Sequence, residues 1–271
     1  HPHIVRLHGF EQDRHTAFIL MEYIDGASLR SVIFDARTGL SLGRVKKVMH
    51  AVCGALYYAH NMGMVHCDIK PANVMLDKYG EVRLADFGIA RVTDGATATL
   101  VGAGTPAYMA PEQIRRENPV PQTDIYALGI MLYEMLTGGE RPFTGDQAQI
   151  TGGTAQKICW EHLNLSPPSV RRWNPSIHPA LDAVVQKCLQ KRVEDRYANA
   201  VELLNAFELA TENVAIEKII PVPAHRNQTS AAPQKKAVFV RPKKTSTAPV
   251  WGYALLGGIL LIFFAAFCDY L

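Results

Sequence analysis

The sequence predicts an α+β fold that begins with short strands, continues as a mainly helical body and ends in one separate apolar helix. Two runs rich in β-branched and aromatic residues occupy residues 1–24. In the body, apolar residues recur at steps of three and four, the spacing of amphipathic helices. With 48% hydrophobic residues among 271, the chain can form one sizeable core plus an appendage.

Strands are predicted at the start of the chain and again before its middle. The runs "HIVRLHGF" and "TAFILMEYI" are separated by the polar "EQDRH", which indicates two strands joined by a turn. Further along, "NVML" and "EVRLAD" flank "DKYG", a pattern typical of a short hairpin.

Helices are predicted over most of the remaining body. A helix over residues 41–61 has Ser41 as its expected N-cap and an apolar stripe formed by Val45, Val48, Met49, Val52, Ala55, Leu56 and Ala59. The run "DIYALGIMLYEMLTG" is apolar on nearly every face and ends at Gly138, which predicts a buried central helix. Two more helices are expected over residues 180–191 and 199–210.

The C-terminal region predicts a membrane anchor. Residues 212–249 contain five prolines and few large apolar side chains, so we expect a disordered linker. Residues 250–267 then form an uncharged run of 18, about the minimum that spans a bilayer as a helix. A buried core helix is the alternative, but the run follows a linker and is apolar all round. Five basic residues within 235–244 precede it, which predicts a single-pass plasma-membrane protein with a cytoplasmic body and a short external tail, 268–271.

Charge and cysteine content exclude other classes. Residues 219–271 carry six basic residues and one acidic residue, which leaves 22 basic and 24 acidic residues in positions 1–218. A nearly neutral body does not indicate a nucleic-acid partner. The five cysteines show no C-x-x-C spacing, so neither a disulfide framework nor a zinc site is expected.

The stretch "VHCDIKPANVML" holds three polar residues that suit phosphoryl transfer. Asp68 can accept the proton of an acceptor hydroxyl, Lys70 can neutralise the transferring phosphoryl group, and the Asn73 amide oxygen can bind Mg²⁺. In the following "DFG", Asp86 ends a strand-like run and suits a second metal ligand. Asp and Asn near Pro are also common turn residues, which is the structural alternative.

Four motifs, in their order and spacing, resemble the eukaryotic-like protein kinase family. They are "HCDIKPAN", "DFG", "GTPAYMAPE" and "DIYALGIMLYEMLTG". The sequence is most similar to bacterial serine/threonine kinases with a membrane anchor, from position 1 to about 210. The resemblance implies a protein-kinase-like fold, with an incomplete β-rich N-lobe over 1–24 and a mainly helical C-lobe over 25–211. It also implies ATP, Mg²⁺ or Mn²⁺, and protein substrates with Ser or Thr hydroxyls.

The resemblance also assigns nucleotide-binding roles. Met21 is implied to be the gatekeeper residue beside the adenine. The backbone of Glu22 and Ile24 is implied to hydrogen-bond the base, with Ser28 near the ribose. Met75 is implied to pack beneath the adenine ring.

Further residues are implied to be structural or regulatory. Asp124 is implied to hold the backbone of the catalytic loop, and Glu112 to form a buried ion pair with Arg196. A hydrophobic column linking the lobes is implied for Leu7, His66 and Phe87. The combination of Lys70 and Thr105 matches the serine/threonine pattern, and candidate phosphorylation sites in the activation segment are Thr93, Thr97 and Thr99.

Two departures from the family stand out. The run "FILMEYIDGASL" resembles the strand and hinge that hold the adenine in this family. No glycine-rich loop, strand lysine or helix glutamate precedes it, and the first lysine is Lys46. With no Met at position 1, we expect this chain to be a fragment of a longer kinase, and we expect the fragment to bind ATP weakly and to transfer phosphate slowly. The alternative is a protein that naturally lacks the first strands. Cys67 replaces the family's Arg before the catalytic Asp and cannot hold a phosphate on the activation segment.

The competing function is a catalytically inactive, membrane-anchored scaffold.

Overall fold

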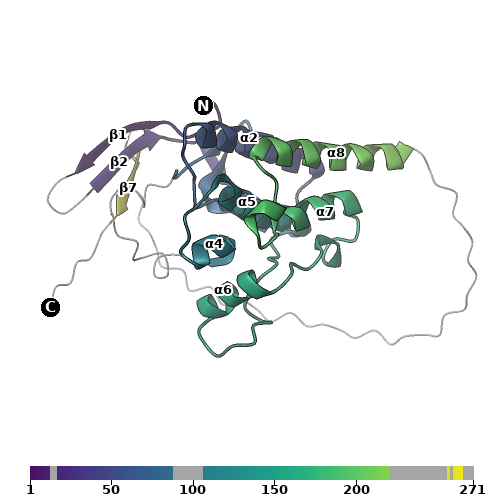
Figure 1. Ribbon diagram of the computed structural model, residues 1–271. Coiled ribbons are helices and arrows are strands. Elements are labelled where there is room, and N and C mark those ends of the chain that lie inside the picture. Colours follow the sequence, from purple (N-terminus) through teal and green to yellow (C-terminus); the bar gives the residue numbers. More distant parts are fainter. Residues whose placement is uncertain (13–16, 88–105, 220–254, 257–258, 265–271) are drawn as a thin grey trace, which may run out of the picture.

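The computed structural model describes residues 1–12, 17–87, 106–219, 255–256 and 259–264 (Figure 1). A small sheet lies at one end of the molecule and a helical body makes up most of the rest. The sheet begins with β1 (Leu7–Gln12) and β2 (Ala17–Glu22), which pair antiparallel and confirm the two predicted N-terminal strands. The strand β1 begins later than predicted, because Ile4 makes only an isolated bridge to Leu84.

A second sheet, ordered β3-β4-β5, positions the polar motifs. Its strands are β3 (Gly26–Ser28), β4 (Val74–Asp77) and β5 (Val82–Leu84). The last two form the predicted hairpin, whose turn is held by Asp77 Oδ1 accepting from the backbone N–H groups of Tyr79 and Glu81. The "CDIKPAN" loop therefore leads directly into this hairpin, and "DFG" follows it.

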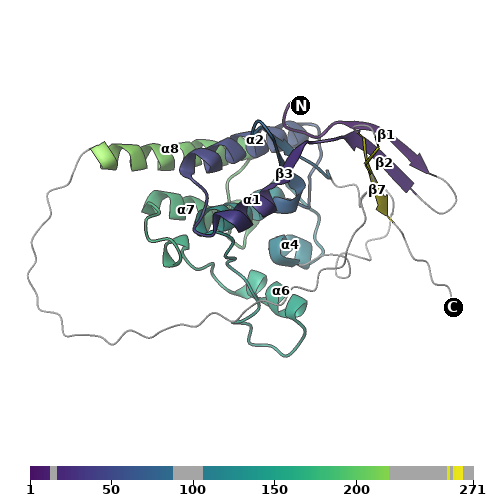
Figure 2. The ribbon, with the colours of Figure 1, turned by 180° about the vertical axis from the view of Figure 1, so that it is seen from behind.

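The helical body surrounds one central helix. Figure 2 shows α2 and α8 side by side from the rear, as in the front view, with α7 beneath α8. The helices are α1 (Leu29–Ala36), α2 (Leu42–Asn61), α4 (Pro111–Ile114), α5 (Pro121–Thr137), α6 (Thr154–Asn164), α7 (Pro179–Cys188) and α8 (Ala200–Ile219). Short 3₁₀ turns occur at η1 (Pro71–Asn73), η2 (Pro106–Tyr108), η3 (Val170–Arg172) and η4 (Val193–Asp195).

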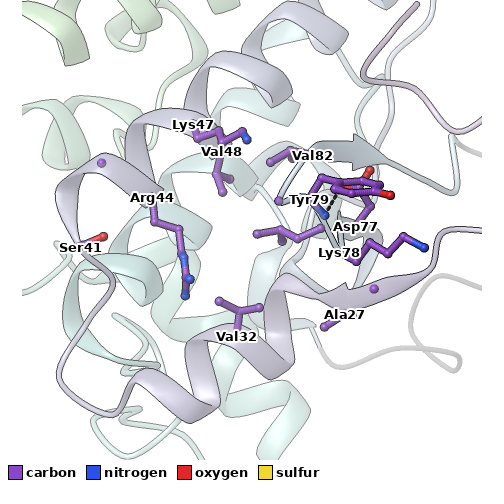
Figure 3. Close-up of a pocket in the computed structure, with 14 residues that line it drawn as sticks. Ala27, Val32, Ser41, Arg44, Lys47, Val48, Asp77, Lys78, Tyr79 and Val82 are labelled. Atoms are coloured by element: carbon purple, nitrogen blue, oxygen red, sulfur yellow. Dashed lines mark hydrogen bonds between the residues drawn. The ribbon is translucent and has the colours of Figure 1, made fainter.

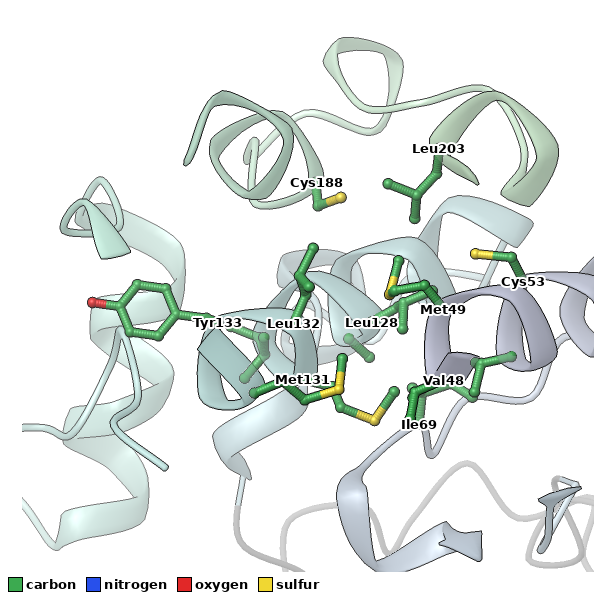
Figure 4. Packing of buried hydrophobic residues seen from close by; sticks show 14 of the residues in the cluster. Val48, Met49, Cys53, Ile69, Leu128, Met131, Leu132, Tyr133, Cys188 and Leu203 are labelled. Carbon is green, nitrogen blue, oxygen red and sulfur yellow. The ribbon is translucent and has the colours of Figure 1, made fainter. Parts of the chain in front are cut away.

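The central helix α5 confirms the prediction of a buried helix. All its residues from Thr123 to Thr137 are buried, and the chain leaves the helix through Gly138, whose φ of 76° is easily adopted only by glycine. In Figure 4, Leu128, Met131 and Leu132 lie in the same apolar cluster as residues of α2, α7 and α8. Each such side chain contributes about 1.5–3 kcal/mol when fully buried.

The helix α2 confirms the predicted apolar stripe, since all seven of its members are buried. Ser41 is the N-cap residue as predicted, but its side chain makes no capping hydrogen bond. The helix α1 was not predicted, because eight residues with two buried apolar positions, Leu29 and Ile33, show too little periodicity.

The predicted linker begins too early at 212. The helix α8 starts close to the predicted position but continues to Ile219, because no proline or glycine interrupts residues 211–220. The first eight residues assigned to the linker are therefore helical, and residues 220–249 lie outside the described residues.

The C-terminal apolar run differs from the predicted membrane helix. It contains the strands β6 (Leu255–Leu256) and β7 (Ile259–Phe264), and β7 pairs antiparallel with β2. None of the helices in the described part of the chain combines the length and apolar character that crossing a membrane requires. A run that is apolar on every face does not distinguish helix from strand by periodicity, and without β7 one edge of β2 would leave its backbone groups unpaired. The tail 268–271 lies outside the described residues.

A buried ion pair fixes the start of α4 to the far side of the body. The guanidinium of Arg196 donates to both carboxylate oxygens of Glu112, at 2.8 Å each, and Thr123 donates to the same carboxylate. Burial alone would raise the pKa of Glu112, but the hydrogen bonds and charge of Arg196 outweigh it and lower the pKa. The pair that was implied by the resemblance is therefore present.

Removing one partner of this pair should strongly destabilise the fold. The substitution Arg196→Met leaves the buried Glu112 carboxylate uncompensated, so we expect the free energy of unfolding to fall by about 3–5 kcal/mol in urea titrations. Arg192→Met is the matched control, because Arg192 pairs with Glu194 on the exposed surface and should matter little. Equal losses in the two variants would contradict the prediction.

A second buried group predicts acid sensitivity. His162 of α6 shares a 2.9 Å hydrogen bond with the Tyr126 hydroxyl, and burial lowers its pKa from 6.5 to about 3. Below pH 6.5 the unfolded chain therefore binds a proton that the folded chain excludes. The stability due to neutral His162 is complete above pH 6.5 and is lost toward pH 3, by about 1.4 kcal/mol per pH unit.

The test compares urea unfolding at pH 7, 5.5 and 4.5. We expect His162→Gln to flatten the loss of stability between pH 6.5 and 4.5, while the exposed-residue variant His8→Gln follows the wild type. Parallel pH profiles for wild type and His162→Gln would exclude His162 as the source.

Candidate active site

Asp68, Lys70 and Asn73 lie together in the segment "CDIKPAN", residues 67–73, between α2 and β4; we call this segment the catalytic loop. Lys70 Nζ lies 2.7 Å from Asp68 Oδ2. Asn73 Nδ2 donates to the same oxygen at 3.0 Å and to the Asp68 carbonyl at 2.9 Å. The 3₁₀ turn η1 brings Asn73 back toward Asp68. The sequence spacing therefore produces the predicted cluster.

The Asp68 carboxylate is placed to accept a proton. Its side chain is 53% exposed, so a hydroxyl group of another molecule can reach it. Both Lys70 and Asn73 bind Oδ2, and no residue in the described part of the chain donates to Oδ1. The free oxygen is thus available as a general base while the other oxygen is held in position.

Asp124 holds the backbone of this loop from inside the core. Its fully buried carboxylate accepts the N–H groups of His66 and Cys67, at 2.8 Å each. His60 Nε2 donates to Asp124 at the same distance. Cys67 has a φ of 65°, a left-handed conformation that costs a non-glycine residue about 1–2 kcal/mol. The bond from Asp124 thus holds strained backbone directly before Asp68.

His66 connects the loop to the "DFG" segment. Its Nδ1 accepts the Asp68 N–H at 3.3 Å and its Nε2 donates to the Ala85 carbonyl at 2.9 Å. Its ring lies 4.5 Å from the Phe87 ring, centroid to centroid. Leu7 was expected to complete this stack, but it is 58% exposed on β1. Leu7 therefore does not join the stack of His66 and Phe87, because every residue of β1 is exposed.

Asn73 and Asp86 fit a divalent cation. Both Nδ2 hydrogens of Asn73 are used by Asp68, which leaves its amide oxygen as an acceptor. Burial raises the pKa of Asp86, the Asp68 charge adds to the increase, and His66 and Lys70 oppose it. Within the described residues, no group of three or more His, Cys or acidic side chains could hold a metal. Mg²⁺ fits nevertheless, because it commonly takes one or two protein oxygens and completes its shell with phosphates and water. The ion would neutralise charge on those phosphates.

A small apolar cluster, suited to form the floor of a base site, lies apart from the main core. Met21 and Ile24 are buried together with Val5, and Met75 packs against them. Met21, Ile24 and Met75 are three of the residues that were assigned to the adenine site. The backbone N–H of Glu22 donates to the Arg6 carbonyl at 2.9 Å within the sheet, so only its carbonyl remains for the base.

Ser28 has a local role that sequence reasoning missed. It is the N-cap of α1, where its Oγ accepts the Ser31 N–H at 3.3 Å. A serine directly before a helix is the ordinary signal for this capping contact, and the place of Ser28 near the ribose stays a prediction. The activation-segment residues Thr93, Thr97, Thr99 and Thr105 lie outside the described residues.

Two further sets of contacts, one at the catalytic loop and one in the helical body, were not predicted. Gln113 Nε2 donates to the Cys67 carbonyl at 2.9 Å. Glu134, buried in α5, binds Arg141 and the Tyr108 hydroxyl. A buried interaction of Glu134 could have been predicted, because it is a charged residue within an otherwise apolar helix. No sequence pattern predicts that Gln113 binds the Cys67 carbonyl.

A groove of about 750 Å³ lies elsewhere, between α1, α2 and the β4–β5 turn (Figure 3). Its lining contains none of the catalytic-loop residues. Two of its basic residues, Lys47 and Lys78, form ion pairs with Glu81 and Asp25. The groove is therefore separate from the site described above.

An aspartate base, a lysine and two oxygen ligands beside an apolar floor define a nucleotide-dependent phosphotransferase. Residues 1–207 match the family described as "Protein kinase domain", so the chain belongs to that family. By family it is a serine/threonine protein kinase.

Bacterial relatives carry the same assignment. The serine/threonine-protein kinase PknL of Mycobacterium tuberculosis is 34% identical over 244 residues, which cover 89% of this chain and 58% of PknL. PrkC of Bacillus subtilis is 31% identical over 286 residues, covering 98% of this chain and 43% of PrkC. PknB of Mycolicibacterium smegmatis is 37% identical over 190 residues, covering 69% and 29%. The chain thus spans about half the length of PknL and PrkC.

Proposed function

We propose that this chain transfers the γ-phosphoryl group of ATP to Ser or Thr hydroxyls of protein substrates. Asp68 accepts the hydroxyl proton, and Lys70 neutralises charge on the transferring group. Asn73 and Asp86 hold Mg²⁺ or Mn²⁺. The observation that carries the proposal is the Asp68 carboxylate, which Lys70 and Asn73 hold by one oxygen while the other stays available.

A catalytically inactive scaffold is the second candidate. It would need neither a held general base nor a pair of oxygen ligands for a metal. The retention of both in one connected arrangement favours catalysis. Within these 271 residues no glycine-rich loop precedes the hinge, so we expect this chain by itself to bind ATP weakly and to turn over slowly.

Phosphoryl transfer is tested by incubating the chain with radiolabelled ATP, Mg²⁺ and a generic Ser/Thr-rich protein. We expect Asp68→Asn to lower the rate of label transfer by about 10²–10⁴-fold, because the general base is lost. The control Asp35→Asn changes an exposed residue of α1 and should leave the rate unchanged. Transfer that is equally fast in Asp68→Asn would refute the assigned role. ATP binding without any transfer by the wild type would favour the scaffold.

The location is also a proposal. We infer that residues 250–267 insert into the plasma membrane and that the kinase domain faces the cytoplasm. The support is sequence composition alone: an uncharged run of 18 residues preceded by five basic residues. The pairing of β7 with β2 is the competing arrangement of the same segment.

Vesicle flotation separates the two arrangements. We expect the full chain to float with vesicles of zwitterionic and anionic phospholipid and to resist an alkaline wash. Leu261→Lys should reduce flotation, because a charge at the centre of a membrane helix costs about 2.5–3.5 kcal/mol. The control Phe10→Lys alters an exposed position of β1 and should float like the wild type. A wild-type chain that stays in the aqueous fraction would rule out the anchor.

A further inference from the structure

Gln113 connects the helix α4 to the peptide bond that precedes Asp68. Its Nε2 donates to the Cys67 carbonyl at 2.9 Å, and its Oε1 accepts the Ala110 N–H at 3.0 Å. Because the Cys67 carbonyl belongs to the peptide bond between Cys67 and Asp68, its direction fixes the plane from which the Asp68 side chain leaves.

The Cys67 backbone is held from two elements at once. Asp124 of α5 accepts its N–H at 2.8 Å, while Gln113 of α4 donates to its carbonyl. Cys67 has a φ of 65°, which a non-glycine residue keeps only when its surroundings enforce it. Two side chains from separate helices therefore maintain the strained turn before the general base.

Gln113 itself stands on a fixed support. The preceding residue, Glu112, is buried and bonded to Arg196 through both oxygens. The Ala110 N–H fixes the other end of the Gln113 amide. The amide group therefore has a defined orientation, and its N–H hydrogens point to the loop rather than to solvent.

We propose that Gln113 is a positioning residue for Asp68, transmitting the placement of α4 to the catalytic loop. The inference that Gln113 holds the loop depends only on the geometry. The inference that this contact supports catalysis by Asp68 rests on the proposed function. The local alternative is that Gln113 serves only to cap α4 through Oε1. A glutamate retains that acceptor but loses the donor, so it distinguishes the two roles.

The test uses the full chain with Gln113→Glu, which places a carboxylate oxygen against the Cys67 carbonyl. The matched control is Gln122→Glu, because Gln122 Nε2 donates to the Ala198 carbonyl at 3.1 Å on an exposed surface. The neutral variant Gln113→Met removes the same bond without adding charge and covers the case in which the glutamate variant does not fold.

The first measurement is hydrogen exchange of the peptide containing residues 65–70, followed by mass spectrometry. We expect exchange to accelerate about threefold to tenfold in both Gln113 variants, since the loop opens more often when one of its holding bonds is lost. Peptides from α7 should exchange at wild-type rates, and Gln122→Glu should match the wild type throughout. Unchanged exchange of residues 65–70 in both Gln113 variants would overturn the proposal.

The second measurement is steady-state phosphoryl transfer. A positioning role predicts that kcat falls at least about tenfold while the KM for ATP changes less than about twofold, because the base is displaced and the nucleotide floor is not. Faster loop exchange with unchanged kcat would overturn the positioning role. A wild-type chain without transfer would instead refute the proposed function and the catalytic part of this inference, and the exchange data would still decide whether Gln113 holds the loop.

Discussion

The buried carboxylate of Asp124 is the contact on which the arrangement of the site depends. An isolated charge in the core would be strongly unfavourable, so it persists only because three N–H donors surround it. Its position in the first turn of α5, at the positive end of the helix dipole, adds to this compensation. Through Asp124 the hydrophobic core itself determines where the catalytic loop lies.

The remainder of the site follows from this constraint. With the backbone of His66 and Cys67 held by α5, the imidazole of His66 can meet both the Asp68 N–H and the Ala85 carbonyl. Asp68 and Asp86, which follows Ala85, are therefore positioned through one ring. On the opposite side, the ion pair between Glu112 and Arg196 fixes α4. Two buried carboxylates, those of Asp124 and Glu112, thus support the exposed carboxylate of Asp68, and each is compensated by hydrogen-bond donors.

Prediction from sequence succeeded where a pattern has one structural solution. The stripe of α2, the all-round apolar α5 ending in Gly138, and the turn before β5 were predicted because periodicity and turn chemistry are local. It failed where the pattern was ambiguous. The capping role of Ser28 was not predicted, Leu7 was placed in a stack that β1 does not join, and the run containing β7 has no hydrophobic period.

The sequence by itself determined the chemistry that we propose, because the types and spacing of Asp68, Lys70, Asn73 and Asp86 are set within 19 residues of chain. The resemblance implied that Asp124 holds the backbone before these groups, but only the tertiary structure revealed the second contact, from Gln113. Asp124 and Gln113 contact Cys67 across 57 and 46 residues. Hydrogen bonds between residues so far apart in the sequence form only when helix packing brings a side chain to a distant backbone group. No local sequence pattern encodes that packing.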